Sequence, residues 1–75
     1  MTLNELVADV LEDKPSNITD ETSRKTHRRW DSFNHIQLAV RLEEEFGVKL
    51  SNAEIEVLAS VAEIRDLLKQ RGVAA

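Results

Sequence analysis

One pattern that is typical of helix starts occurs three times in the sequence: a Ser or Thr followed three positions later by Glu. The pattern spans residues 2–5, 51–54 and 60–63. In such a capping box the hydroxyl and the carboxylate each satisfy a backbone amide that a helix leaves unpaired at its start. The apolar residues nearby recur at helical spacing, and no segment alternates strongly enough to need a sheet. The sequence therefore predicts an all-α fold.

The first helix is expected at residues 3–13, where the apolar residues that share one face are Leu3, Leu6, Val7, Val10 and Leu11. Pro15 excludes a continuation of this helix, because proline has no amide hydrogen and its ring clashes with the preceding turn. Residues 14–30 are mostly polar and show no sustained apolar period. This stretch is predicted to be a long loop, and loops of such length are commonly functional or mobile.

The second helix is expected at residues 32–46, with Asp31 or Ser32 as its cap and Gly47 at its end. Its apolar residues exceed one stripe; they are Phe33, Ile36, Leu38, Ala39, Val40, Leu42 and Phe46. Some of them should remain exposed after the core is filled. This surplus indicates a contact surface on the helix.

A short helix is predicted at residues 52–58 and a longer one at residues 61–71, after which Gly72 ends the fold. Residues 1–75 are thus expected to form a single domain. The predicted architecture is a small four-helix bundle with three main helices, one short helix, and a long loop between the first two helices.

The size and composition of the chain exclude several classes of protein. A chain of 75 residues buries only about 60% of the surface that its unfolded form exposes, so a large enclosed active site is not expected. With no cysteine, neither disulfides nor thiolate metal sites are available. No segment has the length and apolar character of a membrane span or a signal peptide. We expect a cytoplasmic monomer without membrane insertion, and the initiating methionine with its immediate helix favours a stand-alone chain.

Charge is distributed unevenly along the chain. Residues 2–13 carry four acids and no base, whereas residues 14–31 carry five bases against three acids, and the whole chain has a net charge of −4. The net negative charge argues against general nucleic-acid binding. Residues 24–29 nevertheless leave an alternative function open, that of a small helical module that binds protein or nucleic acid through this basic loop.

Two groups of polar residues invite a catalytic or metal-binding interpretation, and both are weak. Ser32 and His35 lie one helical turn apart, as a nucleophile and its base would, but no strained serine elbow or orienting acid accompanies them. The simpler interpretation is a capping serine and a solvated histidine. His27, Asp31 and His35 lack the spacing of metal ligands, so no metal site and no enzymatic activity are expected.

The segment WDSFNHIQLAVRLEEEFGVKL, from Trp30 to Leu50, resembles the acyl carrier protein family. The hallmark of this family is a D-S-L-type triplet that opens a helix ending in L-E-E-E-F, and the triplet here is Asp31-Ser32-Phe33. The resemblance extends through residues 61–68 and, more loosely, back to the first helix. It therefore covers nearly the whole chain.

The resemblance implies that Ser32 is the attachment point of 4′-phosphopantetheine, placed there by a phosphopantetheinyl transferase that uses coenzyme A. The arm of such carriers ends in a thiol that holds acyl or aminoacyl groups as thioesters. The implied partners are that transferase, a loading enzyme for acyl or aminoacyl groups, and downstream transferases or synthases. A serine at the start of a helix suits a phosphodiester, because the helix dipole is positive there.

The same match implies roles for further residues. The positions that correspond to partner-binding residues are Asp31, Phe33, Ile36 and Val40. Leu42 and Phe46 are expected to point inward. A small groove that shelters the cargo in some carriers would be lined here by Leu42, Ile55 and Leu58, although an ordinary filled core is an equal alternative.

Two departures from the family pattern bear on the pathway. Phe33 stands where leucine or methionine is usual, which keeps an apolar anchor beside Ser32. Residues 32–42 contain no acid and include Arg41, whereas fatty-acid carriers usually display several acids there. The sequence therefore indicates a carrier for a specialised pathway, such as polyketide, nonribosomal peptide, modified amino acid or cell-surface glycoconjugate synthesis.

Overall fold

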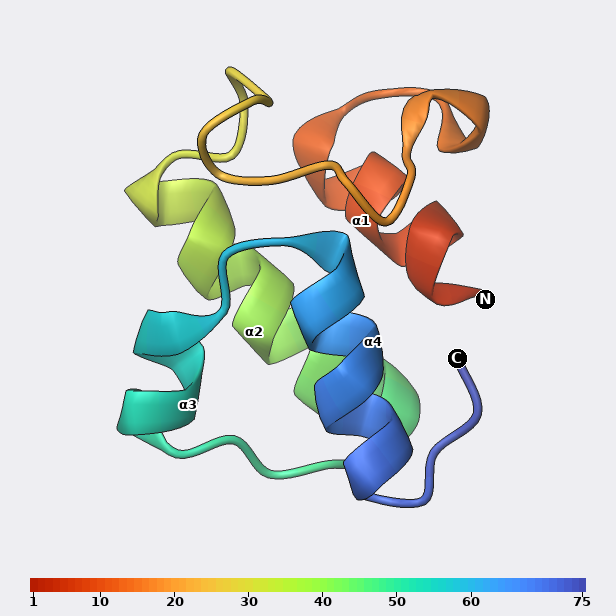
Figure 1. The fold of residues 1–75 in the computed structure, drawn as a ribbon, viewed down its shortest axis with the longest axis vertical. Coiled ribbons are helices and arrows are strands. Elements are labelled where there is room, and N and C mark those ends of the chain that lie inside the picture. The colour runs from red at the N-terminus through yellow and green to blue at the C-terminus, as the bar shows by residue number, and fades with distance from the viewer.

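The computed structural model describes residues 1–75 as an all-helical domain (Figure 1). Its elements are α1 (Leu3–Leu11), the 3₁₀ turn η1 (Pro15–Asn17), α2 (Ser32–Phe46), α3 (Asn52–Val57) and α4 (Val61–Gln70). The predicted fold class is confirmed, with three main helices, one short helix and a long connection between α1 and α2. None of the helices has the length and apolar character that crossing a bilayer needs.

The three predicted capping patterns all start helices, but one differs in detail. The Thr2 hydroxyl accepts the Glu5 amide at 3.2 Å, and the Glu5 carboxylate accepts the Thr2 amide at 2.8 Å. Residues 51–54 form the same reciprocal pair. At α4, the Ser60 hydroxyl accepts the Glu63 amide at 3.2 Å, but the Glu63 carboxylate bonds the Ser60 hydroxyl at 3.3 Å. This third cap is therefore only half a capping box.

The first helix is two residues shorter than predicted. Glu12 adopts a left-handed conformation with φ 55°, and the Asp13 amide donates to the Ala8 carbonyl at 2.9 Å. These bonds close the helix end in the manner of a left-handed cap, although glycine is the usual residue there. At the end of α2, Gly47 does occupy such a position with φ 65°, as expected.

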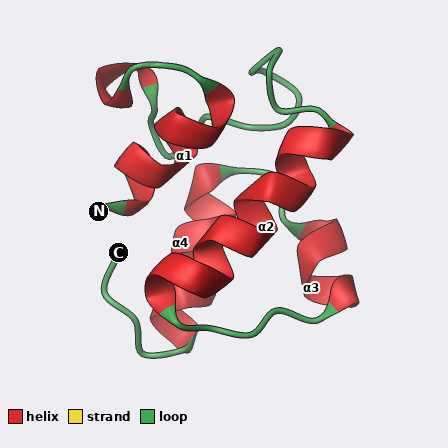
Figure 2. Cartoon of the chain, turned by 180° about the vertical axis from the view of Figure 1, so that it is seen from behind, coloured by secondary structure: helices red, strands yellow, loops and turns green.

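The helices pack around a single apolar core. In Figure 1 and Figure 2, α2 runs diagonally through the domain and overlaps α4 in the view, while α1 and α3 lie on opposite sides. The buried apolar residues are Leu3, Leu6, Val7, Ala8, Leu11, Ile18, Trp30, Leu38, Ala39, Leu42, Leu50, Leu58, Val61, Ile64 and Leu68. Each large apolar side chain contributes about 1.5–3 kcal/mol by its burial.

The connection between α1 and α2 is a loop, as predicted, but it is attached to the rest of the fold. Ile18 and Trp30, near its two ends, are buried in the core. Ser23 forms an isolated antiparallel bridge with Ser60. Two backbone hydrogen bonds join these segments: the Arg24 amide donates to the Ala59 carbonyl at 2.9 Å, and the Val61 amide donates to the Thr22 carbonyl at 3.0 Å. The loop before α2 is therefore held by the turn between α3 and α4.

Asp13 holds the start of this connection in place. Its carboxylate accepts hydrogen bonds from the Asn17 side-chain amide at 2.8 Å and the Lys14 backbone amide at 2.7 Å, and it lies 2.8 Å from the His27 Nε2. The bond from Asn17, followed by those from His27 and Lys14, lowers the pKa of Asp13 from 3.8 to about 2.

Because of this lowered pKa, part of the free energy of unfolding depends on pH. Because the folded-state pKa lies below 3.8, the stabilisation by Asp13 is complete above about pH 4 and is lost as the pH falls towards 2. We expect Asp13→Asn to unfold at lower urea concentration than wild type at pH 5, with a gap that closes between pH 4 and pH 2. Glu56→Gln, which changes a carboxylate without hydrogen bonds, serves as the control. A gap that stays constant with pH would contradict the prediction.

Candidate functional site

Ser32 is the first residue of α2, and its side chain is exposed. The helix cap is Asp31, whose carboxylate accepts the Asn34 amide at 2.9 Å, while the Asp31 carbonyl accepts the His35 amide at 2.8 Å. Of the two capping residues that the sequence offers, Asp31 is therefore the cap and Ser32 is not. Because Asp31 performs that role, the Ser32 hydroxyl makes no hydrogen bond within the fold and faces solvent.

The start of α2 can receive an anion. The backbone amides of Ser32 and Phe33 have no partner in the fold, as is usual for the first turn of a helix. The positive end of the helix dipole adds to their attraction for a phosphate. Asn34 donates from its side-chain amide to the Arg29 carbonyl at 2.6 Å, which fixes the chain just before the helix. The site thus combines an exposed hydroxyl with free amides on an anchored backbone.

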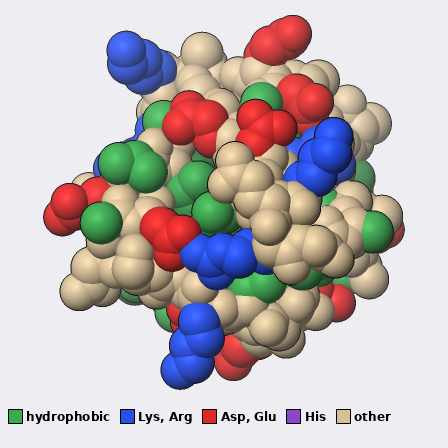
Figure 3. All heavy atoms as spheres, turned by 60° about the horizontal axis from the view of Figure 1, so that its bottom comes forward, with side chains coloured by type: hydrophobic (Ala, Val, Ile, Leu, Met, Phe, Trp, Pro, Cys, Tyr) green, Lys and Arg blue, Asp and Glu red, His purple; other side chains and the backbone are tan.

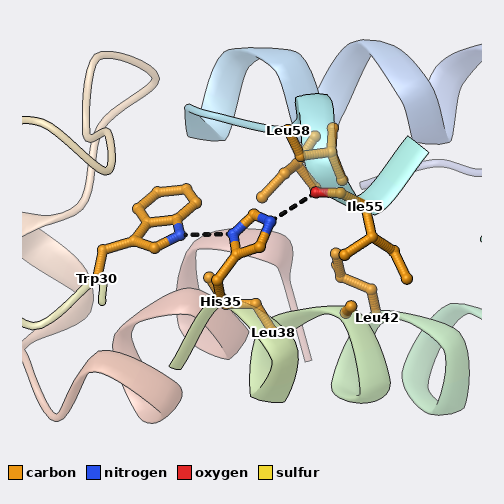
Figure 4. A pocket seen from close by; sticks show the side chains of 8 residues that line it. Trp30, His35, Leu38, Leu42, Ile55 and Leu58 are labelled. Carbon is orange, nitrogen blue, oxygen red and sulfur yellow. Dashed lines mark hydrogen bonds between the residues drawn. The ribbon is translucent and has the colours of Figure 1, made fainter. Parts of the chain in front are cut away.

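The structure places His35 in the interior, so its prediction as a solvated residue is wrong. Its side chain is only 6% exposed. The Trp30 indole donates to His35 Nδ1 at 3.0 Å, and His35 Nε2 lies 2.6 Å from the Ile55 carbonyl (Figure 4). Both ring nitrogens are therefore engaged away from Ser32, and His35 is not placed to act as its base. The signal that was available is Trp30, because a buried indole N–H usually finds a partner.

The proposed groove residues do meet around a small cavity. Leu42, Ile55 and Leu58 line it together with Trp30, His35, Leu38, Ala39 and Ile64 (Figure 4). Its volume is about 10 Å³, about the space that one water molecule needs. The predicted groove residues thus surround one shared space, as the groove alternative expects. That space is nearly filled, as the alternative of an ordinary core expects.

The surplus apolar residues of α2 lie on its exposed face, as the sequence predicts. Phe33 is 70% exposed, Ile36 55% and Val40 46%. Leu42 is buried and Phe46 is half-buried, which agrees with their expected inward positions. Val57, on α3, is 68% exposed and was not anticipated, because a helix of six residues is too short to show a clear apolar period.

The basic residues around the site divide into paired and free groups. Arg29 forms an ion pair with Glu12, and Arg41 bonds the Asp9 carboxylate at 2.8 Å. Arg41 is therefore held by α1. The remaining bases of the loop at residues 24–29 are exposed and have no ion pair: Arg24, Lys25 and Arg28.

A further ionic contact joins α3 to Arg71, the residue that follows α4. Arg71 donates to the Glu54 carboxylate and, at 2.5 Å, to the Lys49 carbonyl. The Arg71 guanidinium, together with the Ser51 backbone amide, lowers the pKa of Glu54. Figure 3 shows the face at the bottom of Figure 1, where acidic and basic side chains lie beside one another between small apolar patches. This mixed face differs from the apolar surface of α2.

Comparison with known proteins identifies the family of this chain. A family model described as "Phosphopantetheine attachment site" matches residues 2–68. The chain belongs to the acyl carrier protein family. A polyketide-8 synthase acyl carrier protein 2 of Streptomyces avermitilis is 36% identical over 69 residues, which covers 92% of this chain and 79% of that protein. An acyl carrier protein of Thermosynechococcus vestitus is 33% identical over 69 residues, which covers 92% of this chain and 85% of that protein.

Membership of this family establishes the general role of the chain. It is a phosphopantetheine carrier for biosynthesis, and carriers of this family hold a covalently attached 4′-phosphopantetheine. Acyl carrier proteins work as carriers that deliver bound groups to biosynthetic enzymes, and a phosphopantetheinyl transferase equips them for this. The residues at the start of α2 fit a phosphopantetheine group. The Ser32 hydroxyl is free, and the neighbouring backbone amides could bind the phosphate of that group.

Proposed function

We propose that Ser32 carries the 4′-phosphopantetheine arm and that the chain shuttles acyl or aminoacyl groups without catalysing their transfer. The observation that carries this proposal is the exposed, uncommitted hydroxyl of Ser32 at the first position of α2. When bound, the group supplies a terminal thiol on which cargo is held as a thioester. The chain has no cysteine and could not supply that thiol itself.

The residues of the chain present the arm and do not react with its cargo. The free backbone amides of Ser32 and Phe33 would hold the phosphate, while the Asp31 carboxylate caps the helix by accepting the Asn34 amide. Trp30 and His35 anchor the backbone on the inner side of the site. Because no base lies beside Ser32, activation of its hydroxyl falls to the external transferase.

The test of this proposal is direct. Co-expression with a broad-specificity phosphopantetheinyl transferase, followed by intact-mass measurement, should show one added phosphopantetheine per chain. A chain that stays unmodified would overturn the proposal. It would favour the alternative of an interaction module that uses the basic loop at residues 24–29, whose free bases are exposed.

We also propose that the carrier serves a specialised pathway and contacts its enzymes through Asp31, Phe33, Ile36 and Val40. Residues 32–42 present apolar side chains and no acid. An enzyme whose docking surface is basic therefore finds little charge complementarity on this face of the carrier. The similarity to a protein named as a polyketide synthase carrier supports this direction. A cytoplasmic location and a monomeric state stay predictions.

The pathway proposal gives an expected result with a fatty-acid malonyl transferase. The phosphopantetheinylated wild type should be a poor acceptor, and Gln37→Glu/Arg41→Ala should accept malonyl groups faster. The gain arises because the variant adds an acid and releases the Asp9 carboxylate from its ion pair, and it should shrink as salt screens the charges. Lys69→Ala/Gln70→Glu makes the same charge change on the exposed end of α4 and serves as the control. Equal, efficient transfer to all three proteins would contradict the proposal and favour a role in fatty-acid synthesis.

A further inference from the structure

His35 has a defined protonation state because of what it contacts. The Trp30 indole can only donate, so His35 Nδ1 must accept and the ring proton must lie on Nε2. His35 Nε2 then donates to the Ile55 carbonyl at 2.6 Å. The result is a neutral imidazole with both nitrogens satisfied inside the fold. Figure 4 shows this chain of bonds running from Trp30 through His35 to α3.

The Ile55 carbonyl needs this partner. It belongs to the last turn of a six-residue helix, where carbonyls have no amide of the same helix to accept. None of the residues of α3 is fully buried. The side chains that bond α3 to the other elements are His35, on its inner side, and Arg71, through Glu54. The position of α3 therefore depends strongly on His35.

The cavity described above lies between α2 and α3, beside these bonds. At about 10 Å³ it has no room for an alkyl chain. A chain could enter only if α3 moved away, and His35 would then lose the Ile55 carbonyl. An alkyl chain offers no acceptor in exchange, so a buried N–H would be left unpaired, which is unfavourable.

We propose that His35 is a specificity-determining residue that keeps the cavity closed to plain alkyl cargo, so that such cargo stays outside on the arm. This inference rests on the proposed function of Ser32 as the attachment point. It assigns to Trp30 the role of orienting His35, and to His35 that of holding α3 over the cavity. The cargo class that fits is a short or polar acyl group that needs no apolar shelter.

The first experiment uses the unmodified protein, so it stands even if loading of Ser32 fails. Amide hydrogen exchange is measured in wild type, His35→Phe and the matched control His27→Phe. His35→Phe keeps an apolar ring but removes both hydrogen bonds, so the amides of residues 52–57 should exchange about five- to tenfold faster, with little change in α1. His27→Phe should leave residues 52–57 as in wild type. Unchanged exchange in His35→Phe would overturn the role of His35.

The second experiment uses protein whose arm carries an acetyl or an octanoyl group. Hydroxylamine attacks the thioester carbonyl carbon, breaks its bond to sulfur and frees the thiol, so the cleavage rate reports how exposed the thioester is. In wild type the two cargoes should be cleaved at rates within about twofold of each other, because neither is sheltered. A rate about tenfold slower for octanoyl in wild type would overturn the proposal, whether or not any variant folds.

The variant then separates gating from simple destabilisation. In His35→Phe the octanoyl thioester should become more protected than the acetyl one, because the loosened α3 admits the longer chain. A merely structural loss would expose both thioesters equally and would count against the proposal. His35→Gln, whose amide group can accept from Trp30 and donate to Ile55, should restore the wild-type pattern. Failure of this rescue would also count against it.

Discussion

Replacing Ser32 with alanine should abolish the addition of phosphopantetheine while leaving the free energy of unfolding close to that of wild type. The stability is retained because Asp31, and not Ser32, accepts the amide of the first turn of α2. Intact mass after co-expression with the transferase measures the first effect, and urea denaturation measures the second.

The control for this experiment is a serine with the opposite role. Ser60 caps α4 by accepting the Glu63 amide at 3.2 Å. Ser60→Ala should lose about 0.5–2 kcal/mol of stability and still be loaded completely. If Ser32→Ala still gained the mass of the arm, the attachment site assigned here would be wrong.

The second large effect concerns stability and separates the two faces of α2. Leu42 is buried against α3 and the cavity, so Leu42→Ala should cost about 2–5 kcal/mol through lost burial and an enlarged cavity. Ile36 is 55% exposed, and Ile36→Ala should stay within about 0.5 kcal/mol of wild type. Chemical denaturation of both variants decides the matter. A large loss for Ile36→Ala would place it in the core and remove it from the proposed contact surface.

The helices could be predicted from the sequence because their signals are local. Capping residues, an apolar period and a terminating glycine act within one or two turns, so the bounds of α2 came out as predicted and those of the other helices within about two residues. The exposed face of α2 followed from the same period. Ser32 was located as a candidate by its triplet and its place at the start of a helix.

The connection between α1 and α2 could not be predicted in the same way. Its order comes from contacts with residues distant in the sequence, such as the bridge between Ser23 and Ser60. His35 is polar, and its position in α2 does not reveal that it forms hydrogen bonds with Trp30 and with the Ile55 carbonyl, which lie on two other segments. The sequence predicts an end of α1 that is two residues too late, because Glu12 adopts a left-handed conformation that glycine usually takes.

The bridge between Ser23 and Ser60 has a consequence for how the protein matures. Residues 59–61, which hold this loop in place, are synthesised after residues 22–31. A nascent chain that lacks residues 59–61 cannot close the bridge, so the loop before α2 lacks this one of its anchors until they are made. We therefore expect the transferase to act efficiently only after residues 59–61 have joined the fold, because the loop before Ser32 lacks this anchor until then.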